Sequence, residues 1–304
     1  MREALSDLIT SSAASNKHFV VLSGDHGYAL FNQIREKHPA QFFNVGVMEQ
    51  AMVGIASGLA KTGHIPLVYG LSAFVPVRVL EQIKLDVCYS ELPVHFLGDG
   101  AGLVYSTLGA SHQCGEDIAC LAPLPLIQIY SPCDTEELRV CYRESMEYDG
   151  PTYIRIGKSD RPAVHSSPLT STEPHFTQSI GKNKSLCLVS TGSMVSVAHS
   201  VAAKLGLPSL SVPRPKPLHE SLLEKVSGFE TLVVIEEHSR HGGLASLIST
   251  LYSDQGQRAP LIRSIALEEK FALRCGSYNY ALSEHDLADE QILARVSKMI
   301  SKDR

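Results

Sequence analysis

The sequence has 304 residues, a formal net charge of −5 at pH 7 and the composition of a soluble globular protein, and its length is enough for two domains. The acidic balance argues against a nucleic-acid partner, and no apolar run reaches the roughly 20 residues that a membrane span requires. The N-terminus shows no signal-peptide core, and the seven cysteines include no C-x-x-C pair. Free thiols in a reducing compartment, the cytoplasm, are therefore expected.

The first predicted elements are a helix over residues 1–15, with Arg2 at its start, and a continuous apolar strand over 18–23. An unbroken apolar run predicts a parallel strand that is covered on both faces. The strand leads into a Gly-Asp-His-Gly turn that contains Asp25 and His26. Open α/β sheets bind ligands beyond such strand ends, although glycine and aspartate are also common in plain turns.

Residues 42–59 predict a short apolar strand followed by a helix of small and apolar residues, in which Glu49 is the one ionisable side chain. No polar stripe appears before Lys61, so we expect a buried helix and a buried Glu49. A buried carboxylate is costly unless it is paired or protonated, so Glu49 should hold or donate a proton near neutral pH. The alternatives are that Glu49 caps the start of the helix or pairs with a distant arginine.

A strand over 65–69 and a helix near 76–88 come next along the chain. Phe74 lies between them and Arg78 lies near the start of the helix. Without further information, a single phenylalanine is most often a core residue and a helical arginine is most often solvated.

The strand over 92–98 enters a long irregular loop over 99–113, and irregular stretches of this length are usually functional. A Gly-Asp-Gly sequence around Asp99 invites interpretation as a site for Mg²⁺ and a diphosphate. That motif needs an asparagine at the right distance downstream, and none occurs between Asn44 and Asn183. The sequence therefore predicts no metal ligands at this position.

The first predicted domain, residues 1–165, ends with a short helix from Glu116, a strand over 124–130, a second helix and a strand over 152–156. Asp134 and Glu137 form a capping box at the start of the second helix. Lys158 follows the last strand, where it is either a substrate ligand or an exposed surface charge.

Residues 166–184 are rich in serine, threonine and proline, which predicts a linker. Strands and helices then alternate through residues 185–304, which predicts a second, smaller domain. The expected elements are strands over 185–190, 209–212, 231–236 and 261–266, and helices over 194–205, 218–226, 243–251 and 287–300. The predicted fold class is α/β, with two domains that each contain a largely parallel sheet flanked by helices.

One segment carries a family resemblance. Residues 42–52, Phe-Phe-Asn-Val-Gly-Val-Met-Glu-Gln-Ala-Met, resemble the pyrimidine-domain signature of the transketolase family of thiamine diphosphate enzymes. In that family, the glutamate that matches Glu49 hydrogen-bonds the aminopyrimidine ring and so activates the cofactor. The resemblance also implies that the helix lies at a subunit interface, where its small residues let another helix approach closely.

Further segments resemble the same family. Phe74, after Tyr69-Gly-Leu-Ser, matches the family phenylalanine that packs on the aminopyrimidine. The segment with Arg78 resembles the version found in split transketolases and deoxyxylulose-phosphate synthases. His112, in the sequence Gly-Ala-Ser-His-Gln, matches a histidine that contacts substrate oxygens and assists proton transfer. The resemblance also implies that Asp25 lies near the cofactor.

Two positions depart from the transketolase pattern. The family aspartate four residues before the histidine is Leu108 here, and a histidine typical of transketolases is replaced by Asp99, as in the synthase branch. These departures leave the choice of substrate open. Arg2 and Lys158 match basic residues that grip a substrate phosphate in the family, and His26 and Asp99 are further candidate substrate ligands.

The resemblance extends over the whole chain, through Thr191-Gly-Ser, Lys216-Pro-Leu and a segment with His238 and His241, both expected to be non-catalytic. The family domain that binds Mg²⁺ and the diphosphate is missing. The resemblance therefore implies the C-terminal (β) subunit of a split transketolase. Such a subunit would work with an N-terminal (α) subunit that carries Mg²⁺, as an α₂β₂ heterotetramer acting on sugars or sugar phosphates.

Two other functions stay open. A decarboxylating relative, similar to deoxyxylulose-phosphate synthase or a 2-oxoacid dehydrogenase E1β subunit, is favoured by Asp99 and Leu108. A non-catalytic regulatory subunit that kept the fold is opposed by the presence of Glu49, Phe74 and His112.

Overall fold

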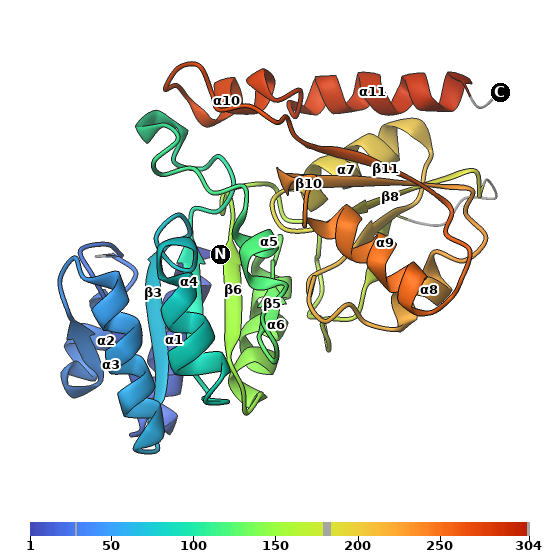
Figure 1. Cartoon of the computed structure of the whole chain (residues 1–304). Coiled ribbons are helices and arrows are strands. Elements are labelled where there is room, and N and C mark those ends of the chain that lie inside the picture. Colours follow the sequence, from blue (N-terminus) through green and yellow to red (C-terminus); the bar gives the residue numbers. More distant parts are fainter. Residues whose placement is uncertain (28, 179–183, 303–304) are drawn as a thin grey trace.

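Two sheets organise the chain in the computed structural model, which describes residues 1–27, 29–178 and 184–302. The first sheet has the strand order β2-β1-β3-β4-β6-β5, and all its neighbouring strands are parallel. The second sheet lies beside the first and has the order β11-β10-β8-β9-β7 (Figure 1). The predicted fold class of two α/β domains is confirmed.

The first sheet is built from short strands joined by helices. Its strands are β1 (Phe19–Ser23), β2 (Phe42–Asn44), β3 (Ile65–Leu71), β4 (His95–Asp99), β5 (Gln128–Tyr130) and β6 (Thr152–Ile156). Its α-helices are α1 (Arg2–Ser15), α2 (Asn32–Lys37), α3 (Glu49–Lys61), α4 (Leu80–Gln82), α5 (Asp117–Leu121) and α6 (Thr135–Glu147). Short 3₁₀ turns η1 (Pro39–Gln41), η2 (Val77–Val79) and η4 (Ser106–Leu108) and a π-helix η3 (Ile83–Cys88) complete the domain.

Helices cover both faces of this sheet, as its unbroken apolar strands require. On one face, Leu5 and Ile9 of α1 join Leu138 of α6 in a buried cluster. On the other, Met52 of α3 packs with Ile118 of α5. Burying each of these side chains contributes roughly 1.5–3 kcal/mol to folding.

The helix expected near 76–88 is not continuous. It is divided into η2, α4 and η3, and the wider π turn keeps Ile83 and Val87 fully buried against the sheet. This irregular segment begins three residues after Phe74 and carries Arg78.

The second sheet is parallel except at its edge, where β7 (His175–Gln178) pairs antiparallel with β9 (Ser209–Ser211). Its other strands are β8 (Leu186–Ser190), β10 (Thr231–Ser239) and β11 (Leu261–Leu267). Its helices are α7 (Met194–Leu205), α8 (Ser221–Lys225), α9 (Leu244–Asp254), α10 (Tyr278–Glu284) and α11 (Asp289–Lys302). Strand β7 lies inside the range 166–184, which we expected to be a linker. Residues 179–183 of that range lie outside the described residues.

A buried polar network joins the two domains. Arg155 of β6 is 2% exposed and donates from Nε to both carboxylate oxygens of Asp117, at 3.0 and 2.8 Å. Its Nη2 donates to the backbone oxygen of Glu237 in the second domain, at 2.7 Å. The Glu237 carboxylate in turn accepts from the Leu103 backbone N–H at 2.6 Å, so each domain supplies partners for the charges of the other.

Helix α3 is only half buried, which corrects the expectation of a fully buried helix. Met52 and Ala56 face the core, but Gly54, Ile55 and Gly58 are exposed. The missing polar stripe therefore does not reflect burial within this chain. It leaves an exposed face of small and apolar residues.

None of the helices in the described part of the chain combines the length and the apolar character needed to cross a bilayer.

Candidate active site

The candidate site lies where β2, β1, β3 and β4 end. These strands are neighbours in the sheet and run in the same direction, so the loops after them meet at one edge. The four loops carry most of the residues that the sequence singled out: Asp25, His26, Glu49, Phe74, Asp99 and His112.

Glu49 is the first residue of α3, behind the Met48 N-cap, and the tight turn before it is set by Asn44 and Gly46. The Asn44 side chain accepts from the Gly46 backbone N–H at 2.9 Å, and Gly46 adopts a φ of +77° that favours glycine. The α3 N-terminus has no side-chain cap, and Glu49 Oε1 instead lies 3.2 Å from Nη1 of Arg78. Of the alternatives for Glu49, the structure therefore shows pairing with a distant arginine. The helix N-terminus also favours a negative charge at this position.

Phe74 is the centre of the cluster. The Arg78 guanidinium lies 4.1 Å from its ring centroid, the His112 ring lies edge-on at 5.2 Å, and the His26 ring lies at 6.3 Å. The structure thus brings together an acid, an aromatic ring, a guanidinium and two imidazoles from the connections that follow four neighbouring strands.

Asp25 lies at the exposed edge of this cluster. Its carboxylate is 3.1 Å from His26 Nε2, and both side chains remain substantially exposed. His112 Nδ1 is 2.9 Å from Ser111 Oγ, which holds the imidazole in the loop after η4. Leu108, at the position of the family aspartate, is 51% exposed.

Asp99 and Arg2 lie together in a second small pocket at the same edge, which Tyr69 and Leu30 also line. The Asp99 carboxylate accepts from the Tyr69 hydroxyl at 2.8 Å and from the Tyr105 hydroxyl at 3.1 Å. Burial, reinforced by the Asp99 charge, raises the pKa of both tyrosines above the usual range, so they remain donors. The sequence interpretation missed the two tyrosines, although Tyr69 is the last residue of the strand predicted over 65–69 and lies in β3 beside the predicted site.

Lys158 lies in a different hollow, in the loop after β6, with Arg161 and Tyr278. Its ammonium group is 2.8 Å from the Asp160 carboxylate and 5.7 Å from the centre of the Tyr278 ring. Lys158 does not line the pocket that contains Arg2, although its neighbour Ser159 does. A joint phosphate-binding role for Arg2 and Lys158 stays a prediction.

His238 was expected to be non-catalytic, and its surroundings are structural. It is fully buried, its Nδ1 lies 2.7 Å from the Ser239 backbone oxygen, and its Nε2 accepts from the Ala119 backbone N–H. Burial lowers the pKa of His238 to about 4, so the ring is neutral at pH 7. The His241 side chain is 71% exposed, and its Nε2 lies 3.8 Å from the Glu269 carboxylate.

The Phe74 cluster fits the aminopyrimidine end of thiamine diphosphate. The Glu49 carboxylate is only 13% exposed and can share a proton with a ring nitrogen. The Phe74 ring is half-buried, and a planar heterocycle can pack against it. Among the described residues, no group of three or more aspartate, glutamate, histidine or cysteine side chains suited to a metal ion lies at this cluster.

Comparison with known families identifies both halves of the chain. The family model described as "Transketolase, pyrimidine binding domain" matches residues 1–162, and "Transketolase, C-terminal domain" matches residues 177–272. The chain belongs to the transketolase family. The family that the sequence predicted is thereby confirmed, and this family depends on thiamine diphosphate.

Individual relatives of this transketolase chain match along most of their length. A "Putative transketolase C-terminal section" from Methanocaldococcus jannaschii is 30% identical over 315 residues, which cover 100% of this chain and 97% of the relative. One of the subunits of an apulose-4-phosphate transketolase from Phocaeicola vulgatus is 30% identical, over 83% of each chain. The prediction of a transketolase-like transferase subunit is confirmed by these relatives.

A solved structure supports the same assignment. The protein titled "Split gene transketolase, inactive beta4 tetramer" superposes on this transketolase chain with a TM-score of 0.85 and 26% identity. The match covers 100% of this chain and 98% of the solved chain. The correspondence therefore includes both domains.

Proposed function

We propose that this chain is the pyrimidine-binding subunit of a split transketolase that moves a two-carbon ketol unit from a ketose donor to an aldehyde acceptor. The observation that carries the proposal is the contact of Glu49 with Arg78 beside the Phe74 ring, at the ends of the parallel strands. When bound, thiamine diphosphate supplies the nucleophilic carbon that accepts and passes on the ketol unit.

Glu49 serves the cofactor by exchanging a proton with a nitrogen of its aminopyrimidine ring. Arg78 holds the Glu49 carboxylate in place, and the Phe74 ring supports the heterocycle by stacking. Because Arg78 lies over Phe74 in the chain alone, the guanidinium must share the ring face with the cofactor or move aside when it binds.

His112 and His26 serve the substrate. Their rings lie on the Phe74 side of the cluster, where an imidazole can donate to or accept from substrate oxygens near neutral pH. Asp25 orients His26 through their contact at 3.1 Å.

We assign the far end of the substrate to the side chains around the second pocket, whose cavity of about 20 Å³ must open to admit it. Arg2 supplies a positive charge there, and Asp99 with its two tyrosine partners supplies hydrogen bonds, which suits a hydroxylated chain that ends in phosphate. Lys158 lies farther along the same edge and reaches the phosphate only if it leaves Asp160.

The partner is an N-terminal subunit that carries Mg²⁺ and the diphosphate site, in an α₂β₂ assembly with two-fold symmetry. The exposed face of α3 supports this assignment. A Cβ atom added at Gly54 or Gly58 would meet nothing within 4 Å in this chain, so another helix could approach closely at both positions. Val47 and Met48, 65% and 52% exposed at the mouth of the site, would be covered by the same partner.

A decarboxylating reaction is the competing function, and it rests on Asp99 and Leu108. With Leu108 exposed at the cluster, a donor hydroxyl meets no carboxylate there, at a cost of about 1–3 kcal/mol. Incubating the reconstituted enzyme with pyruvate and an aldehyde separates the two reactions. Release of CO₂ supports decarboxylation, and transfer from a ketose without CO₂ supports the transketolase reaction.

The cofactor assignment is tested by calorimetry with thiamine diphosphate and Mg²⁺, first on this chain alone and then with its α subunit. Binding only in the mixture is expected for a site divided between two chains. Tight binding by this chain alone would overturn the divided site. Absence of binding in both would overturn the enzymatic proposal.

A further inference from the structure

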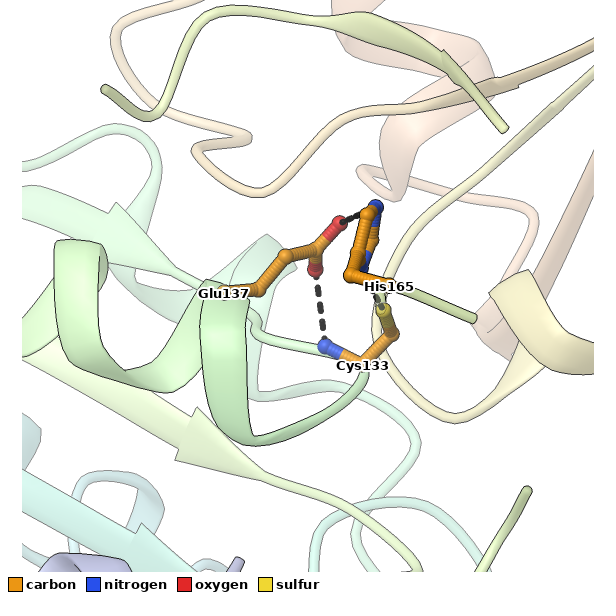
Figure 2. A group of neighbouring side chains, drawn as sticks. All are labelled: Cys133, Glu137 and His165. Carbon is orange, nitrogen blue, oxygen red and sulfur yellow. Dashed lines mark hydrogen bonds and ion pairs between the residues drawn. The ribbon is translucent and has the colours of Figure 1, made fainter. Parts of the chain in front are cut away.

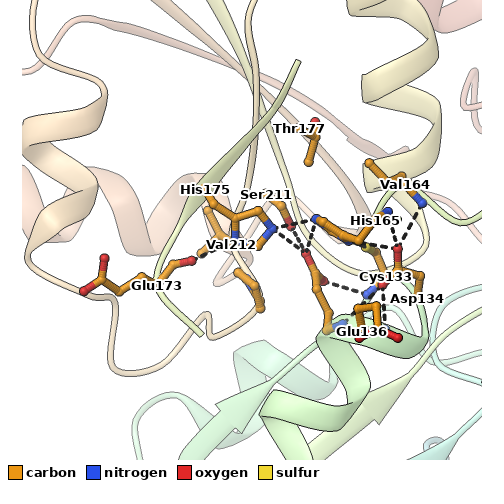
Figure 3. Close-up of polar contacts among 12 residues, drawn as sticks. Cys133, Asp134, Glu136, Val164, His165, Glu173, His175, Thr177, Ser211 and Val212 are labelled. Carbon is orange, nitrogen blue, oxygen red and sulfur yellow. Dashed lines mark hydrogen bonds and ion pairs between the residues drawn. The ribbon is translucent and has the colours of Figure 1, made fainter. Parts of the chain in front are cut away.

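A polar cluster at the domain junction, away from the candidate active site, carries a further function. Asp134 and Glu137 lie at the start of α6, His165 lies in the segment that leads to the second domain, and His175 lies on β7. Figure 2 shows Glu137 and His165 together with Cys133, which lies just before α6, and Figure 3 shows the surrounding hydrogen bonds. The proposed cofactor chemistry uses none of these residues.

The hydrogen bonds fix the protons on both imidazoles. His165 Nδ1 lies 2.8 Å from Asp134 Oδ2, an oxygen that also accepts two backbone N–H groups and therefore acts as a carboxylate. His175 Nδ1 lies 2.9 Å from the backbone oxygen of Glu173, which can only accept. Each Nδ1 therefore carries a proton, and each neutral ring has its lone pair on Nε2.

The two Nε2 atoms face one another. They are 2.8 Å apart, and they lie 3.3 Å (His175) and 4.0 Å (His165) from Oε1 of Glu137. Two lone pairs and a carboxylate oxygen directed at one point repel each other. The arrangement requires a positively charged species between them, either a proton or a metal ion.

The charge of the cluster is compatible with a divalent ion. Asp134 and Glu137 are 4% and 0% exposed, and within the described residues no lysine or arginine forms an ion pair with either one. The nearby charged residues pair elsewhere, Glu136 with Arg139 and Glu173 with Lys225. A shared proton compensates one of these two negative charges, whereas a divalent ion compensates both and leaves the thiolate of Cys133, one of its ligands, as the remaining charge.

We propose that this cluster binds a divalent metal ion of the zinc class through His165 Nε2, His175 Nε2, Glu137 Oε1 and Cys133 Sγ. Nitrogen, oxygen and thiolate ligands in a closed set of four are typical of structural zinc. Cys133 Sγ lies 3.9 Å from Nδ1 of His165 and belongs with Glu137 and His165 to a group whose ligand atoms lie within 4.8 Å of one another, so the Cys133 side chain must turn toward Nε2 to bind the ion. Ligand atoms about 2.1 Å from zinc are about 3.4 Å apart in a tetrahedron, so the imidazoles separate slightly and Glu137 approaches.

The contacts behind the ligands support the same assignment. Metal-binding histidines usually donate their other ring N–H to a carboxylate or a backbone carbonyl, which fixes the ring orientation. His165 donates its Nδ1–H to the Asp134 carboxylate, and His175 donates its Nδ1–H to the backbone carbonyl of Glu173. The sequence predicted no metal ligands, and Cys133 and His165, which are 32 residues apart, match no ligand-spacing motif that would have indicated a site.

The ion would connect the two domains. It would tie α6 of the first domain to β7 of the second, where Ser211 of β9 also donates to Glu137. This role is structural and independent of the proposed function, so loss of the ion should lower stability before it affects catalysis.

Metal content tests the proposal directly. The full chain, purified without chelator and dialysed with zinc, is expected to retain about one zinc ion by elemental analysis, and chelation should lower its unfolding temperature. His175→Gln should lose the zinc. His219→Gln is the matched control, because His219 is a partly exposed neighbour that contacts Glu173 and not the cluster.

Cobalt substitution provides a second measurement that does not depend on the folding of the His175 variant. The wild-type chain loaded with Co²⁺ should show visible bands of a tetrahedral site and a thiolate-to-cobalt charge-transfer band, and Cys133→Ser should lose the latter. Retention of less than about a tenth of an equivalent of zinc or cobalt by the folded wild-type chain would overturn the proposal and favour the shared proton. Retention of zinc by His175→Gln would also overturn it.

Discussion

The guanidinium of Arg78 lies 4.1 Å from the centre of the Phe74 ring. The same guanidinium is 3.2 Å from the Glu49 carboxylate, so one side chain sets the position of both residues that are assigned to the cofactor.

Replacing Arg78 with lysine should weaken cofactor binding while most of kcat is retained. Lysine keeps the charge but lacks the planar group that stacks on Phe74 and donates to Glu49. A loss of about 0.5–2 kcal/mol corresponds to a roughly 2- to 30-fold higher cofactor Kd, measured by calorimetry on the assembled enzyme. Arg139→Lys, at a half-exposed arginine of α6, is the control. An unchanged Kd in Arg78→Lys would show that the guanidinium does not organise the site.

Glu49→Gln should lower kcat by about 10²–10⁴-fold, because an amide cannot exchange the proton that activates the cofactor. Since Glu49 is partly exposed and lies at a helix end, the change in unfolding free energy should remain small. Activity and denaturant unfolding are to be measured side by side, with the exposed Glu81→Gln as the control. Full activity in Glu49→Gln would remove Glu49 from the mechanism.

Gly54→Leu should block association with the partner subunit without unfolding this chain. The position is exposed and has free space around a Cβ, and leucine raises helix propensity by about 0.5–1 kcal/mol over glycine. Sedimentation of the mixed subunits should show at least a tenfold loss of affinity, as expected when a bulky residue prevents close helix packing. Gly54→Ala tests size at the same position and should retain most of the affinity. Normal assembly of Gly54→Leu would place the interface elsewhere.

Arg155→Met should destabilise the chain by about 3–5 kcal/mol, because it leaves the Asp117 carboxylate buried without its partner. Denaturant unfolding measures this loss. Adding Asp117→Asn to Arg155→Met should restore part of the stability, since the orphaned charge is then removed. A double variant that is less stable than Arg155→Met would contradict this explanation.

Stability should fall as the pH is lowered from 8 to 5, partly through His95. Burial lowers the pKa of His95 to about 3, well below its unfolded value of about 6.5, so the unfolded chain gains a proton first. The stabilisation is complete above pH 6.5 and is lost as the pH falls toward 3, by about 2 kcal/mol at pH 5.

His95→Gln should reduce the difference in unfolding free energy between pH 8 and pH 5 by this amount. Glutamine can still bond to Thr152, which lies 2.8 Å from His95 Nδ1. His18→Gln, at an exposed histidine, is the control. An unchanged pH dependence in His95→Gln would show that other groups cause the acid destabilisation.

The sequence predicted those parts of the fold that depend on local periodicity. The strand over 152–156 and the helix over 194–205 have the predicted bounds, because unbroken apolar strands and amphipathic helices follow directly from residue spacing. The π-helix after Phe74 was missed because a single extra residue per turn leaves almost no trace in the apolar pattern.

Contacts between distant segments were the other source of error. The apolar pattern of α3 is the same whether its outer face meets this chain or another one, so the sequence alone could not show that Gly54 and Gly58 are exposed. Similarly, Asp134 and Glu137 were interpreted as a local cap, and Asp134 does accept from the Glu136 and Glu137 backbone N–H groups. Their imidazole partners come from a loop and a strand that only the folded chain brings close.

The network around Arg155 also constrains how this protein can evolve. The two family matches suggest modules that recombination could exchange freely, yet Arg155 of one module donates to the Glu237 backbone of the other. A transplanted first half would keep the Asp117 acceptor of Arg155 but would lose the backbone oxygen placed for its Nη2. A transplanted second half would bring a Glu237 carboxylate that lacks the Leu103 N–H. The two halves are therefore expected to be inherited together.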